Sequence, residues 1–278
     1  MNRKTYFCIC QLTIETVERK IMAIITLTSD WGLSDYYVAA VKGAIYSMLP
    51  GATVVDITHN IEPWDIASAA FIIRNCYQNF PEGTIHIIAV ETEESAEKPH
   101  IALKANGHYF IGTDNDIFSL ILGDTPYEAV TIEVIQDSDY FTFTTRDRFV
   151  KVAAMIANGA PFSEIGKPYP EIRKCITFQP TIDANSIHGI ITFIDSYENA
   201  VSNITMELFE KIRNGRAFEI RLGKYTIDKV YRSYTEVPIA EKLALFGTHG
   251  YLEIAMNHGK AASLLGLSLD TSVDIFFK

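Results

Sequence analysis

Between Met22 and about Gly166, short β-branched runs alternate with longer segments whose apolar residues recur at helical spacing. The predicted strands and helices follow in the order Ile24–Thr28, Tyr37–Leu49, Thr53–Ile57, Asp65–Phe80, Thr84–Val90 and, further on, Asp147–Asn158. Asn106-Gly107 predicts a tight hairpin between His100–Lys104 and Tyr109–Gly112. Alternation of this kind is typical of a mostly parallel sheet with helices on both faces. Residues 22–166 are therefore predicted to form an α/β domain.

The pattern changes after a proline-rich segment. Four of the ten prolines lie between Pro161 and Pro180, which predicts an interdomain linker over residues 167–182. Beyond it, Glu207–Arg213 has helical spacing, whereas the other apolar runs are short and strand-like. These runs are Ile187–Ile194, Ala217–Leu222, Tyr225–Ile227, Leu243–Phe246, Tyr251–Met256 and Val273–Phe277. Residues 183–278 are therefore predicted to form a small all-β, barrel-like domain.

Residues 1–21 are predicted to be an extension that precedes the fold. Their apolar run is interrupted by Gln11 and Glu15 and has no small-residue cleavage site, so it does not fit a secretory signal. The first predicted strand starts only after Met22, which makes Met22 an alternative start of translation.

Charge and cysteine content narrow the choice of partner and compartment. The chain has 24 basic and 34 acidic residues, and its net charge of −10 argues against a protein that binds nucleic acid through its phosphates. No apolar run reaches the roughly 18–20 residues of a membrane helix, so no membrane association is expected. The four scattered cysteines favour a reducing compartment, and we predict a cytoplasmic protein.

Common catalytic and ligand-binding signatures are absent from the sequence. It contains no GxGxxG, no GxxxxGK[ST], no HExxH, no CxxC and no GxSxG motif. The seven histidines show no metal-ligand spacing. We therefore expect neither nucleotide binding of the Rossmann or P-loop type nor a histidine-based metal site; that no metal and no cofactor take part is what the family resemblance described below implies.

One acidic residue stands where open α/β sheets bind their ligands. Asp30 directly follows the first predicted strand, and ligands of such sheets lie outside the carboxyl ends of the strands. A carboxylate there can accept hydrogen bonds from the vicinal hydroxyls of a ribose. Asp is also common as a helix N-cap, so a purely structural role stays open.

Four stretches of the sequence together point to a known family. They are TLTSDWGLSDYYVAAVKGAIYSMLPGATVVDITHNIEPWDIASAAFII, YFIGTDNDIF, IDSYENAVSNI and GTHGYLEIAMNHGKAA. In this order they resemble the S-adenosylmethionine (SAM) hydroxide adenosyltransferases and the related fluorinases and chlorinases, from Met22 to Lys278. The resemblance implies an α/β domain, a β-barrel domain and a homotrimer with active sites between subunits. It also implies metal-independent attack on the ribose C5′ of SAM, which is the substrate rather than a cofactor.

The resemblance implies that the half of the site that holds the substrate is largely kept. Asp30 matches the acid that clamps the ribose diol, Asp35 matches the second acid of that loop, and Trp64 matches an aromatic residue that packs on the ligand. Further positions match residues that hold the amino-acid or adenine end of SAM. They are Asp195, Tyr197, Asn199, Thr248, His249 and Asn257, and Phe143 is a further expected substrate-binding residue.

The catalytic half of the family pattern is substituted. Hydrolases of the family carry a D-P-G-V-G-T-x-R run and a later F-H-G-R-D run, whose Asp, Arg and His are thought to activate water. By register, Glu91 replaces the Asp, Lys98 the Arg and Thr144 the His. Lys lacks the planar fork of Arg, and Thr cannot titrate near neutral pH. Thr145 falls where a fluorinase has the serine that contacts its halide.

Three interpretations follow. The first is a SAM hydrolase in which Glu91 and Lys98 orient the water and Thr144 or Thr145 adds a hydrogen bond. The second is a protein that binds adenosyl ligands without catalysis, since the glutamate-rich run Glu91–Lys98 is also typical of a solvated loop. The third is an adenosyltransferase that uses a halide. We expect hydrolysis to adenosine and methionine.

Overall fold

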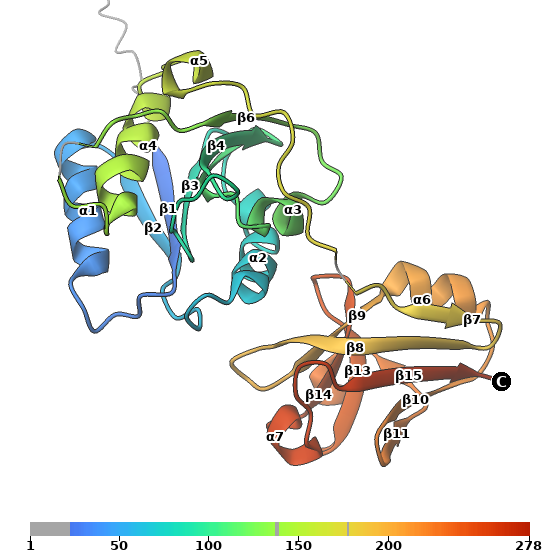
Figure 1. Ribbon diagram of the computed structural model, residues 1–278. Coiled ribbons are helices and arrows are strands. Elements are labelled where there is room, and N and C mark those ends of the chain that lie inside the picture. The colour runs from blue at the N-terminus through green and yellow to red at the C-terminus, as the bar shows by residue number, and fades with distance from the viewer. Residues whose placement is uncertain (1–22, 137–138, 177) are drawn as a thin grey trace, which may run out of the picture.

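The computed structural model describes residues 23–136, 139–176 and 178–278, so the predicted extension over residues 1–21 lies outside the described part of the chain. Two bodies of secondary structure follow one another along the chain (Figure 1). The first alternates strands with helices, and the second consists mainly of strands. This arrangement confirms the predicted fold class.

Six of the described strands form the sheet of the first domain, in the order β2-β1-β3-β5-β4-β6. Their bounds are β1 (Ile24–Ser29), β2 (Thr53–Thr58), β3 (Ile85–Ala89), β4 (His100–Ala105), β5 (His108–Thr113) and β6 (Tyr127–Thr131). β2, β1, β3 and β5 are parallel, and β4 is antiparallel to both of its neighbours. β4 and β5 form the predicted hairpin, in which Asn106 and Gly107 both adopt positive φ.

Helices cover both faces of this sheet (Figure 1). α1 (Tyr37–Met48) and α4 (Val150–Ala157) pack on one face, where Val41 and Phe149 are buried with Ile25 and Ile87. α2 (Ile66–Arg74) and α3 (Ile117–Leu122) pack on the other face. The remaining helical segments are η1 (Tyr77–Asn79), the π-helix η2 (Thr145–Phe149) and α5 (Phe162–Ile165). Strands buried on both faces are expected to be apolar throughout, as β3 nearly is.

The beginning of the proline-rich segment packs on the first domain. The buried carboxylate of Asp114 accepts hydrogen bonds from the Tyr169 hydroxyl (3.0 Å) and from the N–H of Arg173 (2.8 Å). The Ile172 side chain is buried in the same core as α2 and α3. Residues 169–173 are therefore fixed to the first domain.

In the second domain, eight of the described strands follow one another in the order β11-β10-β15-β8-β9-β14-β13-β12, and β7 pairs with β8. The sheet curls into a nearly closed, barrel-like body around a large apolar core, and a smaller apolar cluster lies beside Val237 and Leu243. The strands are β7 (Thr181–Asp183), β8 (Ser186–Ile194), β9 (Ala200–Thr205), β10 (Phe218–Leu222), β11 (Tyr225–Ile227), β12 (Val230–Tyr231), β13 (Lys242–Phe246), β14 (Tyr251–Met256) and β15 (Ser272–Phe277). The helical segments are α6 (Met206–Arg213), η3 (Tyr234–Glu236) and α7 (Ala261–Leu265).

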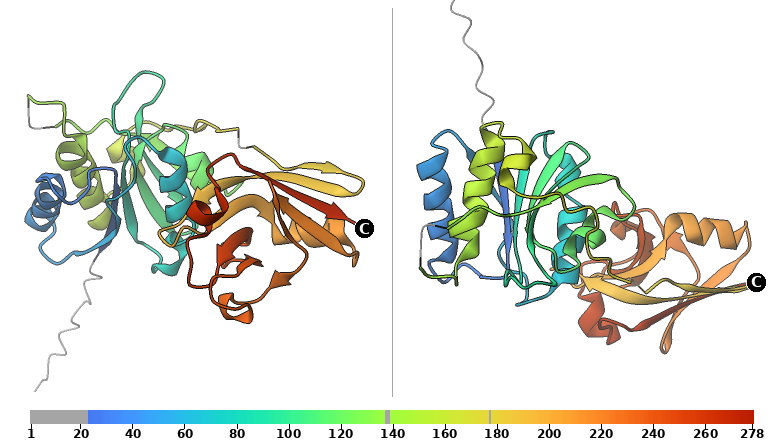
Figure 2. Two further views of the ribbon diagram at one scale, coloured as in Figure 1. Left: turned by 90° about the horizontal axis from the view of Figure 1, so that it is seen from below. Right: turned by 45° about the horizontal axis from the view of Figure 1, so that its top comes forward.

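The two domains meet beside α2 (Figure 2). Phe71 of α2 stacks on Phe193 of β8, with ring centroids 4.3 Å apart and ring planes 22° from parallel. Within the described residues, no helix is both long enough and apolar enough to span a membrane.

Candidate functional site

Three neighbouring parallel strands end at one edge of the first sheet. Ser29 of β1 lies opposite Ala89 of β3, and Ile87 of β3 lies opposite Ile111 of β5. The next residues along the three strands bring Asp30, Glu91 and Asn115 to that same edge. The carboxyl end of a parallel sheet is where α/β proteins bind ligands. We call Asp30, Trp64, Glu91, Lys98 and Asn115 the strand-end site.

The structure brings Asp30 and Trp64 together. Asp30 Oδ2 accepts a hydrogen bond from the N–H of Trp64 at 3.1 Å. Trp64 has φ +66°, and its side chain is 72% exposed beside that carboxylate. Tyr36, not Asp30, is the N-cap of α1, so Asp30 does not have the capping role that its sequence position allowed. Asp35 lies in the same loop with its side chain exposed.

Glu91 and Lys98 form an ion pair, with Lys98 Nζ 2.6 Å from Glu91 Oε1. Both side chains are half-buried. Asn115 fixes the backbone beneath them, since its Nδ2 donates to the carbonyls of Val90 and Glu91 at 3.1 Å each. The Oδ1 atom of Asn115 is buried without a hydrogen-bond partner. Residues 93–97 of the glutamate-rich run are exposed, whereas Glu91 and Lys98 at its two ends are half-buried.

The segment from Phe143 to Thr145 lies next to the loop that follows β1. The Phe143 ring meets Trp31 edge-on at 5.6 Å, and η2 packs against β3 and β5. Thr144 and Thr145 are both buried, and the Thr145 hydroxyl has no hydrogen-bond partner. A buried hydroxyl in this state retains a proton and lone pairs for a ligand or water.

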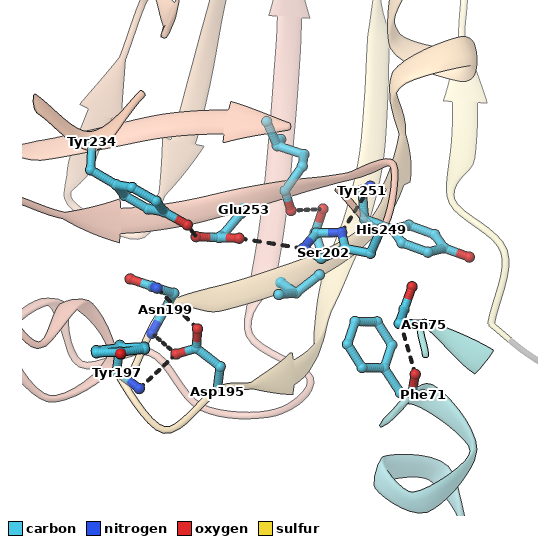
Figure 3. A network of polar contacts seen from close by, with 12 residues as sticks. Phe71, Asn75, Asp195, Tyr197, Asn199, Ser202, Tyr234, His249, Tyr251 and Glu253 are labelled. Carbon is cyan, nitrogen blue, oxygen red and sulfur yellow. Dashed lines mark hydrogen bonds and ion pairs between the residues drawn. The ribbon is translucent and has the colours of Figure 1, made fainter. Parts of the chain in front are cut away.

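A second group of predicted residues lies in the second domain, at the turn between β8 and β9 (Figure 3). Asp195 Oδ1 accepts from the N–H groups of Tyr197 (2.9 Å) and Asn199 (2.8 Å), and Asp195 Oδ2 accepts from Asn199 Nδ2 (3.0 Å). Tyr197 is 78% exposed, whereas Asn199 is buried. The carboxylate therefore shapes its own turn, and a ligand would meet a preformed loop.

The same view shows Glu253 between Tyr234 and His249 (Figure 3). The buried Glu253 accepts a hydrogen bond from the Tyr234 hydroxyl at 2.8 Å, and its other oxygen lies 3.3 Å from His249 Nε2. Burial, together with Glu253 and Asp195, raises the pKa of Tyr234, which stays protonated. His249 Nδ1 accepts from the N–H of Tyr251, so both ring nitrogens are engaged within the chain. The ring lies close against Gly247, where a Cβ would come within 2.4 Å of Nε2.

Two further predicted residues complete this group. Thr248 is exposed beside His249. Asn257 is buried, and its Nδ2 donates to the Val237 carbonyl at 2.8 Å. Its Oδ1 atom has no hydrogen-bond partner, which leaves a buried acceptor in the segment matched to the adenine side.

Within the described residues, no hydrogen bond, ion pair or ring contact directly joins the strand-end site to the Asp195 turn. The structure thus brings the predicted residues together as two groups. In residues 23–136, 139–176 and 178–278, no cluster of three or more His, Cys, Asp or Glu residues could hold a metal ion.

The sequence reasoning missed Asp114 and Asn115. Both follow β5, and Asn115 contacts the Glu91 backbone directly. Burial raises the pKa of the Asp114 carboxyl, which holds residues 169–173 in place. The signal was present, since these residues follow a strand of the same sheet as Asp30 and belong to the quoted YFIGTDNDIF run. The run supported the resemblance, but its polar residues were given no role.

Comparisons with known proteins match the two domains separately. The sequence profile of the SAM hydroxide adenosyltransferase N-terminal domain matches residues 25–166, and that of the C-terminal domain matches residues 189–274. The (R)-S-adenosyl-L-methionine hydrolase of Thermus thermophilus is 29% identical over 86% of this chain and 94% of its own length. A fluorinase from an Actinoplanes species is 26% identical over 91% of this chain and 97% of its own.

A solved structure shows the same fold. A conserved protein from Thermotoga maritima superposes with a TM-score of 0.82 at 26% identity, over 91% of this chain and 99% of its own. Hydrolase and fluorinase relatives are about equally similar in sequence, so similarity alone does not select the nucleophile.

Proposed function

Because this chain belongs to the SAM hydroxide adenosyltransferase family, we propose that it hydrolyses SAM to adenosine and L-methionine. The oxygen of a water molecule attacks the ribose C5′ and forms a C–O bond. The C5′–S bond breaks, its electron pair stays on the sulfur of methionine, and one proton leaves the attacking water. The observation that carries the proposal is the Glu91–Lys98 pair at the sheet edge where Asp30 also lies.

The sulfonium is already a good leaving group, so the protein needs to orient the substrate and activate the water. Water has a pKa of about 15.7, and a carboxylate that takes its proton as C5′ is attacked lowers the barrier. In this proposal Glu91 accepts that proton, and Lys98 orients the Glu91 carboxylate. The Thr145 hydroxyl, and Thr144 beside it, hold the water by hydrogen bonds.

The binding roles follow the two groups of residues. Asp30 accepts hydrogen bonds from the ribose hydroxyls, while Trp64 and Phe143 pack on the ligand beside Asp35. The turn of Asp195, Tyr197 and Asn199 holds the methionine end, and Thr248, His249 and Asn257 lie on the adenine side. His249 offers its ring face, since both of its nitrogens are already engaged.

A complete site in this proposal takes one group from each of two chains. Within the described part of one chain, no hydrogen bond, ion pair or ring contact joins the strand-end site to the Asp195 turn, which favours a homotrimer with its sites between subunits. We propose metal-independent chemistry with SAM as substrate, in the cytoplasm.

Use of a halide is a second candidate. The unpartnered Thr145 hydroxyl stands at the position matched to the halide-contacting serine of fluorinases. A halide needs only hydrogen-bond donors and a dry pocket, so Glu91 would then be dispensable. Binding without turnover is a third candidate, since the Glu91 carboxylate is already paired with Lys98.

Product analysis separates these candidates. Purified protein is incubated with SAM, with and without chloride, and the products are separated by chromatography beside a heat-inactivated control. We expect adenosine and methionine to form whether or not chloride is present. A chloride-dependent adenosyl product would instead identify an adenosyltransferase that uses halide. Binding of SAM without any product would leave an adenosyl-binding protein and overturn the hydrolase.

A further inference from the structure

Arg148 joins η2 to the loop that carries Glu91 and Lys98, which is far away in sequence. It belongs to η2, three residues after Thr145. Its Nη1 donates to Glu94 Oε2 at 2.6 Å and to His100 Nδ1 at 2.9 Å. Its Nε and Nη2 donate to the carbonyls of Val134 and Ile132, at 3.2 Å and 2.5 Å. The guanidinium is thus anchored on the segment after β6 and holds Glu94, in the middle of the Glu91–Lys98 loop (residues 91–98).

His100 holds the same loop from beneath. Its side chain is buried, and its Nε2 donates to the carbonyl of Thr92 at 2.8 Å. Because Nδ1 accepts from Arg148, the ring is neutral, with its proton on Nε2. Phe149, the neighbour of Arg148 in η2, meets the ring edge-on at 5.0 Å. Two residues of η2 therefore position the imidazole, and the imidazole positions Thr92, next to Glu91.

We propose that Arg148 and His100 are positioning residues that hold the Glu91–Lys98 loop in register with the η2 segment that carries Thr144 and Thr145. The inference rests on the proposed hydrolysis, since it assigns the two residues to the placement of Glu91 and Lys98. Neither of them contacts the substrate. A carboxylate displaced by about 1 Å from the attacking water loses much of its effect, about 10²-fold in rate.

The arrangement makes this positioning dependent on pH. Burial lowers the pKa of His100, Arg148 lowers it further, and the Thr92 carbonyl and Glu94 act in the opposite direction. The charged groups facing the ring are Glu94 from the loop and Arg148 from η2. Protonation places an N–H on Nδ1 against the Arg148 guanidinium, so the hydrogen bond between them is lost. Below the pKa of His100 the loop is expected to loosen and kcat to fall.

Paired substitutions in the loop test the role of Arg148. Glu94→Gln weakens the contact with Arg148, and Glu93→Gln changes the adjacent exposed glutamate as a matched control. Arg148→Met removes the whole anchor. We expect Glu94→Gln and Arg148→Met to lower kcat by about 10–100-fold with little change in KM, and Glu93→Gln to leave both unchanged. Hydrogen exchange of the amides of residues 91–98 should accelerate in Glu94→Gln and Arg148→Met but not in Glu93→Gln.

A third variant tests His100 separately. His100→Gln keeps a donor for the Thr92 carbonyl and an acceptor for Arg148 but cannot be protonated. It should retain more activity at pH 7.5 than Arg148→Met, and its kcat should persist to lower pH than that of the wild type. A purely structural residue would change stability without moving the acidic limb of the profile.

The outcomes separate this inference from the proposed function. Absence of turnover by the wild-type protein would overturn the hydrolase itself. Turnover by the wild type with unchanged kcat in both Glu94→Gln and Arg148→Met would overturn only the positioning role. Unchanged exchange of residues 91–98 in both variants would overturn it as well.

Discussion

Among single residues, the carboxylates of the site differ in how much of their hydrogen-bonding capacity the protein itself uses. Asp30 accepts one backbone N–H, from Trp64, and the Glu91 carboxylate is paired with Lys98. Asp195 accepts three hydrogen bonds from its own turn. We therefore expect Asp30 and Glu91 to matter most through the ligand, and Asp195 to matter also through the shape of its turn.

Substitution of Asp30 should weaken ligand binding without unfolding the loop. Asp30→Ala is expected to weaken binding of SAM by about 1–3 kcal/mol, the usual loss for a hydrogen bond to a charged group. Asp30→Asn keeps an acceptor for the Trp64 N–H, so the affinity that this variant loses reports mainly on the missing charge. Isothermal titration calorimetry measures both variants, and unchanged affinity in both would remove Asp30 from the ribose site.

Substitution of Glu91 should affect turnover rather than binding. Glu91→Gln removes the proton acceptor but keeps the size of the side chain, so kcat should fall by about 10²–10⁴-fold. Steady-state kinetics with Glu93→Gln as the control measures this loss. A kcat equal to that of the control would show that Glu91 does not activate the water.

Sequence reasoning reached the position of Asp30 because the end of a parallel strand is a general ligand site. It could not foresee that both nitrogens of His249 are engaged. Glu253, one of the two partners, is four residues away, and only the fold of β14 brings it back to the ring. The bond from the Tyr251 N–H depends in the same way on local geometry.

Among the elements, α2 begins where its sequence predicts but ends earlier than predicted. Asp65, placed near the start of the predicted helix, is the N-cap and accepts from the N–H of Ser68 at 3.0 Å. The prediction ran on to Phe80, but α2 ends at Arg74. The Asn75 side chain donates to the Phe71 carbonyl, and a separate 3₁₀ turn follows. Apolar spacing that continues through such a break hides it from sequence analysis.

The cap gives a prediction for stability. Asp65→Ala should lower the free energy of unfolding by about 1 kcal/mol, because the Ser68 N–H loses its acceptor. Urea denaturation measures the change, with Glu62→Ala, an exposed neighbour outside the helix, as the control. Equal stability of the two variants would contradict the capping role.

Elements whose apolar residues show no regular spacing were not predicted from the sequence. α3 is a run of six mostly apolar residues, too short to show helical spacing. β9 carries Ser202 and Asn203 in its centre, and both form hydrogen bonds that only the folded barrel supplies. By contrast, β11 and β14 begin and end as predicted, since turn residues bound their apolar runs.

At the scale of the whole molecule, two buried histidines make the stability of the first domain depend on pH. His86 and His108 lie 3.2 Å apart, His86 also bonds the Thr26 hydroxyl at 2.7 Å, and both side chains are buried. Burial, and to a lesser extent the His108 ring, lowers the pKa of His86 to about 3. Burial lowers the pKa of His108 as well.

Acid should therefore destabilise the fold well above the titration range of its carboxylates. The unfolded chain protonates these rings near pH 6.5, whereas the folded chain does not until the pH is much lower. The contribution of these two histidines to stability is thus present above pH 6.5 and is lost as the pH drops toward 3. His86 alone should remove about 2 kcal/mol between pH 6.5 and pH 5.

Urea denaturation at several pH values tests this expectation, with a His86→Gln variant for comparison. The variant should show a flatter dependence of unfolding free energy on pH, whatever its absolute stability. An identical slope for variant and wild type would show that His86 does not stay neutral in the folded state.

The central claim is attack of water on C5′, and isotope labelling tests it most directly. SAM is incubated with the protein in water enriched in ¹⁸O, and the products are analysed by mass spectrometry. The account predicts one ¹⁸O atom in the 5′-hydroxyl of adenosine and none in methionine. Adenosine without the label, or no adenosine at all, would contradict it.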